Sequence, residues 1–514
     1  MEKASLQKRL YSESNLYLAA YLAPSYVFNE ELLCSEDMQT LHALKDAYNE
    51  DVYQETMESV KMRLQKIMND PNDYFHTEVY FKPKSFKETK DGNGEGSMVF
   101  RPLHTANLVD QIAMVAMLQL LVYDVQDDNT LVPSELSRLM PDNFYGNRIA
   151  YDGRNLFKPW KEQYHAYTSR EDELTYLYRD SGKYRFAIEL DLENFFPSVN
   201  PWLVYRLMNE KMPLHYNLED QETYKTILRK LLIFRLTKPL KNKESQWYCK
   251  NLNCCTYAKG IPQGLPHSYF LANFLMIQIQ KIFQAELPGD MLFYVDDSVV
   301  FTNAIVDPAE LEGKIKRINE QLKNISLDVD PSPVLPEWEY EQDSFIISVH
   351  DIHDRKTSCV HLTKDDMPPD KVYLRGICRE TSGISFDIHS IAAEEDTQAV
   401  QSRVEEILYA INKEMDRVGN QKAMQEDEDA DKKDLGRANT ESYLKKLIQY
   451  RKFFGNRRLL LSRLSEDQYG EFRTLFIKEV NSICSEMRMT KQARISLLPG
   501  SVVSSCGAFD RMLW

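Results

Sequence analysis

The chain has 514 residues, 43% of them hydrophobic, and a formal net charge of −15. This length accommodates about two to four domains with sizeable cores. The acidic balance argues against a protein that coats long nucleic acid, because lysine and arginine drive phosphate binding. The 8 cysteines are too sparse for a disulfide scaffold, and no segment has the ~20 apolar residues that span a bilayer. Composition predicts a soluble, cytoplasmic protein that does not cross a membrane.

The start of the chain predicts a helical region, residues 1–75. Ser35 is a candidate N-cap before an acidic first turn, and apolar residues recur at helical spacing through Val60, Leu64 and Ile67. The next apolar runs, VYF and MVFRPL, flank the segment KETKDGNGEG. Its Gly, Asn and Asp content predicts a hairpin turn between two strands.

Two strand signals follow, and each places acidic residues at a strand end. FAIEL ends at Asp191, and MLFYV meets SVVF across Asp296 and Asp297. The next apolar residues are spaced like one face of a helix: Leu311, Ile315, Ile318, Leu322 and Ile325. Strands covered by helices predict an α+β domain over residues 76–390.

Beyond residue 390 the strand signals fade, which predicts an all-α C-terminal domain, 391–514. One segment of it is basic and contains interspersed aromatic residues. Its candidate DNA-binding residues are Lys445, Lys446, Arg451, Lys452, Arg457 and Arg458. This pattern suits single-stranded DNA, which combines phosphate attraction with base stacking. A helix with a cationic, solvated face explains the pattern equally well.

The three aspartates at the strand ends suggest metal chemistry. Transfer of a nucleotide uses two Mg²⁺ ions, which prefer carboxylate oxygens, and Mn²⁺ is an alternative ion. An isolated Asp-Asp pair is usually a surface turn. Here Asp296 and Asp297 lie between apolar strands, downstream of Asp191 and of GIPQGLPHS. This arrangement predicts that the three carboxylates converge.

These segments carry a family resemblance. DLENFFPSV, GIPQGLPHSYFLANF and YVDDSVVF resemble motifs A, B and C of reverse transcriptases, in that order. Upstream, VYFKPK and RPLHTANLVDQIAMVAM resemble the fingers motifs of the same family. The resemblance implies fingers and a palm, with N-terminal helices before them. It also implies that Asp191, Asp296 and Asp297 are catalytic and bind the metals.

The resemblance further implies how the nucleotide is held. Phe196 matches the steric gate that excludes a ribose 2′-hydroxyl, so deoxynucleoside triphosphates are the expected substrates. Lys82 and Arg101 match the cations that grip the triphosphate. Gln263 and Gly264 match the motif B loop, together with Gly260, where glycine permits close approach to the nucleotide.

Other polar residues carry no catalytic assignment. His267 has no partner in sequence and predicts a packing role. The spacing of Cys249, Cys254 and Cys255 fits no zinc pattern. After the helix through Ile325, SLDVDPSPV lacks the lysine that many relatives carry, so the sequence names no general acid for pyrophosphate.

With its acidic balance and without recognisable accessory domains, the chain resembles the bacterial abortive-infection reverse transcriptases, the group that contains AbiK, AbiA and the P2-prophage enzyme. That resemblance implies antiphage defence, a homo-oligomer and template-independent synthesis primed by a protein tyrosine. The product would be single-stranded DNA, covalently attached to protein. The sequence does not identify the priming residue.

Alternative hypotheses use the same palm. A retron-like or intron-like enzyme would copy an RNA partner, and a catalytically dead palm would serve as a scaffold. The three retained aspartates argue against the scaffold. An RNA polymerase is disfavoured because Phe196 would obstruct ribonucleotides.

Overall fold

The computed structural model describes residues 5–88, 96–125, 130–193, 195–237, 260–307, 309–327, 348–349, 358–362, 470, 474 and 503–504. Two compact units divide the chain. The first comprises Met1–Val79, Leu103–Pro239 and Asn251–Met367, and the second comprises Tyr80–Pro102, Leu240–Lys250 and Pro368–Trp514. The predicted all-α domain at 391–514, including its six candidate DNA-binding residues, lies almost entirely outside the described residues.

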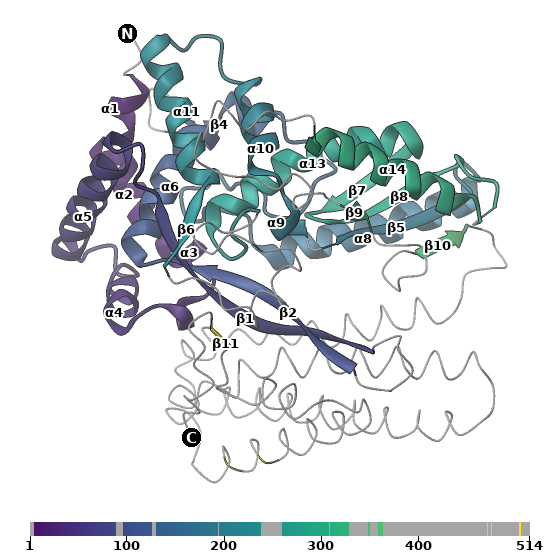
Figure 1. Ribbon diagram of the computed structural model, residues 1–514, viewed down its shortest axis with the longest axis horizontal. Helices are drawn as coiled ribbons and strands as arrows, with labels where there is room; N and C mark the ends of the chain where they lie inside the picture. The colour runs from purple at the N-terminus through teal and green to yellow at the C-terminus, as the bar shows by residue number, and fades with distance from the viewer. Residues whose placement is uncertain are drawn as a thin grey trace. The chain divides into compact units, whose positions relative to one another are not determined.

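The first unit begins with helices, as the sequence predicts (Figure 1). They are α1 (Leu6–Leu10), α2 (Glu13–Tyr21), α3 (Ala23–Tyr26), a 3₁₀ turn (Glu30–Leu32), α4 (Ser35–Ala43) and α5 (Glu50–Asn69). Helix α5 buries the predicted stripe of Val60, Leu64 and Ile67. The cap prediction for α4 is wrong by one residue, because the Sγ of Cys34 accepts the hydrogen bond from the Asp37 amide. A thiol takes the position that hydroxyl and carboxylate side chains usually fill.

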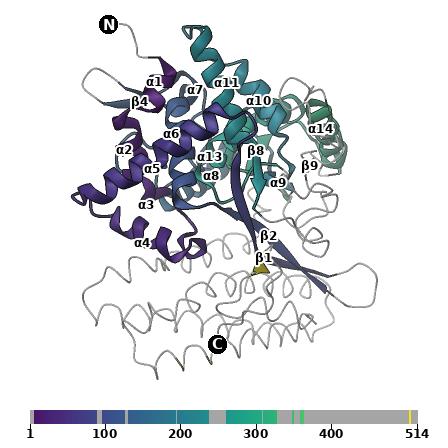
Figure 2. The ribbon, with the colours of Figure 1, turned by 60° about the vertical axis from the view of Figure 1, so that its left-hand side comes forward.

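Helix α6 (Leu108–Val122) lies in the core of the first unit. All of its residues except Val109 are buried. It packs against α1, α2, α5 and α13, and Figure 2 shows α2, α5 and α6 side by side. A helix that is apolar around its whole circumference has to be covered on every side. The side chain of Asn107 caps it by accepting a hydrogen bond from the Asp110 amide, at 2.7 Å.

The two strands predicted around the glycine-rich turn are present as β1 (Phe75–Glu88) and β2 (Gly96–Thr105), which are neighbours in one sheet. The turn residues 89–95 lie outside the described residues. Strand β6 (Phe234–Leu236) pairs in parallel with the start of β1, and β11 (Val503–Ser504) pairs antiparallel with its middle.

A second, antiparallel sheet carries the predicted acidic strand ends. Its strand order is β10-β5-β8-β7, and a short strand β9 also pairs with β5. The strands are β5 (Phe186–Glu193), β7 (Gly289–Tyr294), β8 (Asp297–Thr302), β9 (Ser348–Val349) and β10 (Ser358–His361). This central sheet and its helices, together with the helical N-terminal layer, agree with an α+β class.

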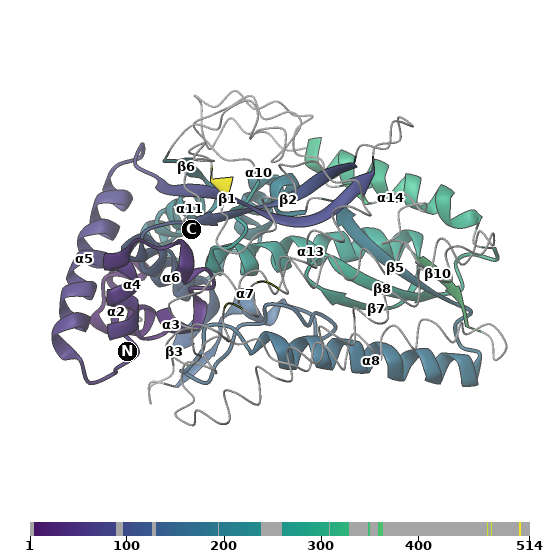
Figure 3. The ribbon, with the colours of Figure 1, turned by 90° about the horizontal axis from the view of Figure 1, so that it is seen from below.

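Helices cover both faces of this sheet (Figure 3). On one face lies α13 (Pro266–Glu286), whose Phe283 ring stacks on Phe293, and α14 (Glu310–Leu327) packs on α13. On the other face lies α8 (Trp160–Ser181). The buried side chains that join α8 to the sheet are Tyr167, Leu174, Tyr178, Leu292, Val299 and Phe301. The predicted face of α14 is confirmed at its four buried positions: Leu311, Ile315, Ile318 and Leu322.

The remaining elements connect these layers. Strands β3 (Tyr123–Val125) and β4 (Leu131–Pro133) form a two-stranded ribbon. The short or surface helices are α7 (Glu135–Arg138), α9 (Phe195–Ser198), α10 (Pro201–Asn209) and α11 (Leu218–Leu232). Among the described helices, none is both long and apolar enough to cross a bilayer.

Candidate active site

Asp191 lies on β5, two residues before the strand ends, and is only 4% exposed. Its Cα is the register partner of Asp297 on β8, which in turn pairs with Tyr294 on β7. Directly opposed residues of an antiparallel pair project to the same face of the sheet. Asp191, Asp297 and Tyr294 therefore share one face at one end of the sheet.

Asp296 lies in the tight turn that joins β7 to β8. It is half-buried, whereas Asp297, the first residue of β8, is exposed. Val295, the residue before Asp296, has a φ of 59°. A left-handed conformation is unusual for a β-branched residue and costs on the order of 1–3 kcal/mol, so it persists only where surrounding contacts enforce it.

The contacts that enforce this turn come from residues 143–147, which we call the buttress segment. It runs beside β7, where the Tyr145 amide donates to the Phe293 carbonyl at 2.8 Å. The Nδ2 of Asn273 on α13 donates to the Gly146 carbonyl at 2.7 Å. A Cβ on Gly146 would lie 2.6 Å from a Cγ of Val295. Helix α13 thus holds the buttress segment against the turn.

Sequence reasoning missed the buttress segment. Its sequence, NFYGN, contains a Gly-Asn pair that signals a turn, but nothing in it names Val295 as a neighbour. The contact between Gly146 and Val295 joins residues far apart in sequence, so only the folded chain reveals it.

Phe196 lies in α9, directly after β5, and is 5% exposed. Its ring meets the edges of Phe195 and Tyr269 at centroid distances of 5.5 and 5.8 Å. Gly260, with a φ of 69°, lies against this turn: a Cβ there would fall 2.0 Å from the Phe196 carbonyl oxygen. The Ile261 amide donates to that same oxygen at 3.1 Å. Motif A and the motif B loop are therefore in direct backbone contact.

The next part of the motif B loop contacts β2. The carbonyl of Gln263 accepts a hydrogen bond from the His104 amide at 2.7 Å. Gly264 has a φ of 109°, and a Cβ there would lie 2.8 Å from the His104 carbonyl oxygen. The structure thus requires glycine at 260 and 264 for close approach to other backbone segments. Their approach to a nucleotide stays a prediction.

The remaining nucleotide-binding candidates lie on the hairpin. Lys82 is on β1, with its side chain outside the described residues, and Arg101 is exposed on β2. Both fall in the second unit, and their contact with a triphosphate stays a prediction. His267 is buried, and burial lowers its pKa to about 3. A neutral, buried imidazole agrees with the predicted packing role.

The aspartates supply the hard oxygen donors that Mg²⁺ prefers. Asp191 and Asp297 are register partners, and Asp296 adjoins Asp297 in the turn. Within the described ranges, no three His, Cys, Asp or Glu side chains are gathered closely enough to hold a metal ion. The carboxylate donors and their strand positions suit a divalent ion, but the structure does not gather Asp191, Asp296 and Asp297 into a metal-binding cluster. Their convergence around an ion stays a prediction.

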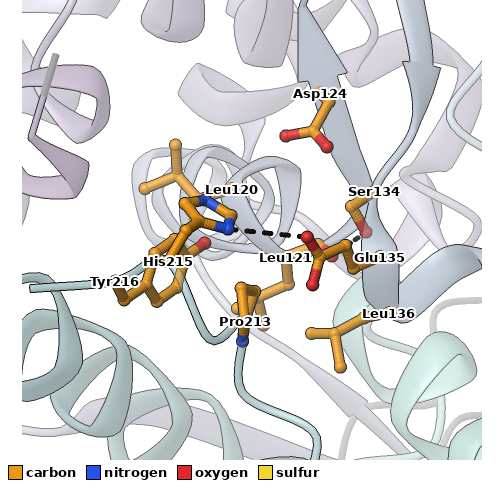
Figure 4. A pocket seen from close by; sticks show the side chains of 9 residues that line it. All are labelled: Leu120, Leu121, Asp124, Ser134, Glu135, Leu136, Pro213, His215 and Tyr216. Carbon is orange, nitrogen blue, oxygen red and sulfur yellow. Dashed lines mark hydrogen bonds and ion pairs between the residues drawn. The ribbon is translucent and has the colours of Figure 1, made fainter. Parts of the chain in front are cut away.

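A surface pocket lies elsewhere in the first unit (Figure 4). His215 and Glu135 face each other across it, with 3.5 Å between Nδ1 and Oε1. The pocket is lined by Leu120, Leu121, Asp124, Ser134, Glu135, Leu136, Pro213, His215 and Tyr216. None of the predicted site residues lines it.

A buried strand aspartate opposite an Asp-Asp hairpin tip, on an antiparallel sheet covered by helices, is the arrangement expected of the palm that the sequence predicts. Residues 129–332 match the family model of the reverse transcriptase (RNA-dependent DNA polymerase). The chain therefore carries the catalytic domain of a reverse-transcriptase-type nucleotidyltransferase. The match includes the three aspartates, Phe196, Gln263 and Gly264. No curated protein matches the chain.

Proposed function

We propose that this chain is a DNA polymerase of the reverse-transcriptase type that synthesises DNA without a template, primed from a protein side chain, in bacterial antiphage defence by abortive infection. The observation that supports the polymerase is the placement of Asp191 opposite Asp297, beside Asp296, within the matched domain. The defence role, the priming and the template independence rest on the sequence resemblance and on the acidic composition.

In this proposal, Asp191, Asp296 and Asp297 would hold two divalent ions, Mg²⁺ or Mn²⁺. When bound, such ions activate the attacking hydroxyl and neutralise the departing pyrophosphate. The burial of Asp191 in β5 keeps its carboxylate fixed on the sheet. The enforced conformation of Val295 fixes where the turn presents Asp296. Fixed donors need little reorganisation during the reaction.

Phe196 would select deoxynucleotides. Its backbone is held by Gly260 and Ile261, so the Cα that carries the ring cannot shift without moving the motif B loop. Lys82 and Arg101 would bind the triphosphate, because paired cations favour phosphate oxygens. Gln263, with its backbone fixed by His104, would contact the nucleotide through its side chain.

A second candidate function is templated synthesis on an RNA partner, as in retrons or intron-encoded enzymes. The observation that favours it is the description of the matched family, which is an RNA-dependent DNA polymerase. A catalytically dead scaffold is less well supported, since it has no use for three aspartates at one end of the sheet. The two enzymatic functions differ in whether an added template is needed.

The test incubates purified protein with Mg²⁺ or Mn²⁺ and labelled deoxynucleotides, with no template or primer. Products are resolved on a denaturing gel with and without protease. Label that stays with the protein, is released by protease and is absent from the Asp296→Asn and Asp191→Asn variants supports untemplated, protein-primed synthesis. Label that requires an added template and primer supports the second candidate. Full synthesis by either variant would overturn the assignment of the aspartates.

The proposal also includes a homo-oligomer in the bacterial cytoplasm. Sedimentation of the purified protein across a concentration series measures the assembly directly. A monomer at all concentrations would remove that part of the proposal and leave the polymerase unaffected.

A further inference from the structure

We propose that the N-terminal end of α8 is a stacking site for unpaired bases at the 3′ end of the growing DNA strand. The side chains that form it are Trp160 and Tyr164, which we call the α8 platform. This inference rests on the proposed function, because the strand it binds is the product of DNA synthesis.

The α8 platform continues the apolar stripe by which α8 packs on the sheet. Residues three and four apart lie on one face of a helix, and Trp160, Tyr164 and Tyr167 have that spacing. Tyr167 is 6% exposed and packs under the sheet, but Tyr164 is 46% exposed and Trp160 is 62% exposed. The stripe therefore extends past the covered part of the sheet. A core-packing role explains Tyr167 and does not explain the two exposed rings.

The platform is fixed beside the catalytic turn. The Tyr164 ring meets the Tyr294 ring edge-on, with 5.2 Å between centroids. The hydroxyl of Tyr294 donates to the Trp160 carbonyl at 3.4 Å. Tyr294 is the register partner of Asp297. A strand whose 3′ end lies at the aspartates would thus have its preceding bases near these rings.

The charge beside the platform suits a phosphate backbone. The ammonium of Lys161 lies 5.9 Å from the centre of the Trp160 ring, and Lys158 is exposed just before the helix. Glu162, also exposed, is the acidic residue in this turn. Cations next to accessible rings are the combination that single strands use, because phosphate attraction and base stacking act together. Within a duplex the base faces are stacked on one another and only the end pair exposes one, so two successive rings suit an unpaired strand.

The test measures binding of a short labelled oligodeoxynucleotide to the full-length protein by fluorescence anisotropy, without deoxynucleotides. Stacking contributes ~1–3 kcal/mol per base, which predicts an affinity loss of about 5- to 150-fold for Trp160→Ala or Tyr164→Ala. Trp160→Phe retains a ring and should restore most of the affinity. The matched control is Tyr176→Ala, because Tyr176 is 42% exposed on the same helix and should leave binding unchanged.

An abasic strand of equal length separates stacking from phosphate attraction. It should bind the protein weakly, and Trp160→Ala should change that binding little. Wild-type affinity in both alanine variants, or equal losses with abasic DNA, would overturn the platform. Unchanged DNA binding combined with lost self-association would assign the surface to a second copy of the chain. Because binding is measured without synthesis, loss of the platform leaves the polymerase assignment standing, and absent synthesis does not affect the binding result.

Discussion

His104 and His267 are buried histidines, and their burial makes folding sensitive to acid. Burial lowers the pKa of each to about 3, whereas an unfolded histidine titrates near ~6.5. Between these values the unfolded chain binds a proton that the folded chain does not. Stability is therefore fully present above pH ~6.5 and falls as pH decreases, by ~1.4 kcal/mol per pH unit for each histidine.

The measurement is the unfolding midpoint of wild type and of His104→Gln over the acidic range. Removing one histidine should reduce the slope of the free energy of unfolding against pH by the contribution of about one proton, ~1.4 kcal/mol per pH unit. His42→Gln is the control, because His42 is exposed. Identical pH profiles for wild type and His104→Gln would contradict the prediction.

Phe196 allows a test of sugar selection. Truncation in Phe196→Ala should open the gate and allow ribonucleotide incorporation, although loss of a buried ring costs ~3–5 kcal/mol of stability. Phe195→Ala is the matched control, since Phe195 is buried and in ring contact with Phe196. Incorporation of labelled ribonucleotides and deoxynucleotides is compared at a temperature where both variants are folded. Equal discrimination in wild type and Phe196→Ala would remove the gate role.

At the residue scale, the sequence located the aspartates well because strand ends and turns leave local signals. Asp191 and Asp297 are register partners at one end of one sheet, and Asp296 adjoins Asp297 in the turn. The predicted convergence of the three carboxylates around an ion stays a prediction. The roles of the glycines were harder to predict. Gly260 meets the Phe196 backbone and Gly264 meets that of His104, and such long-range approaches leave no trace in local sequence.

At the scale of elements, the buttress segment should control the catalytic turn. In Gly146→Ala, the added Cβ would meet Val295, and the turn would have to shift. Small displacements of reacting groups can cost about 100-fold in rate, so we expect a comparable loss of synthesis with a folded protein. Asn273→Ala should act in the same direction, because it removes the hydrogen bond to the Gly146 carbonyl.

The control for Gly146→Ala is Gly313→Ala. Gly313 lies within α14, and a Cβ there would meet only the end of Arg317 at 3.8 Å. That substitution should preserve synthesis and slightly raise the unfolding midpoint, since alanine favours a helix over glycine. Normal synthesis by both Gly146→Ala and Asn273→Ala would show that the turn does not depend on the buttress segment.

Elements with strong periodicity were predicted well from sequence. The α14 stripe and the strands around the acidic turn match the structure because one buried face imposes a fixed spacing. Two features had no such signal. The first is the extension of β5 beyond Asp191 to Glu193, where β5 pairs with β9. The second is α8, which covers the face of the sheet that carries Asp191 and Asp297. Both depend on partners distant in sequence.

At the scale of the whole molecule, a chain with a net charge of −15 needs local cations to hold DNA. We predict that replacing Lys445, Lys446, Arg451 and Lys452 with glutamine reduces the salt dependence of single-stranded DNA binding. Each lost phosphate contact lowers the slope of log affinity against log salt by ~0.7. Replacing Lys316 and Lys323 on α14, both exposed, is the control. An unchanged slope would favour the solvated helix face.

The domain organisation predicted from the sequence concerns many residues outside the described part of the chain. The boundaries at 75 and 390 stay predictions. The all-α assignment of 391–514 is wrong at Val503–Ser504, which form strand β11 by pairing with β1, and stays a prediction for the rest. The boundary at 75 rests on the first strand signals and the boundary at 390 on their loss. Such signals report local preference and not which segments pack together.

The burial of α6 limits how this enzyme can be divided or exchanged between proteins. The family match begins at residue 129, after α6 has ended, yet α6 packs on α13, which carries Asn273. A fragment with the matched boundaries would leave the α6-facing surface of α13 open to water and would lack the helix that fills it. The smallest part that could be transplanted intact is therefore larger than the part that family similarity outlines, and it includes the N-terminal helices that enclose α6.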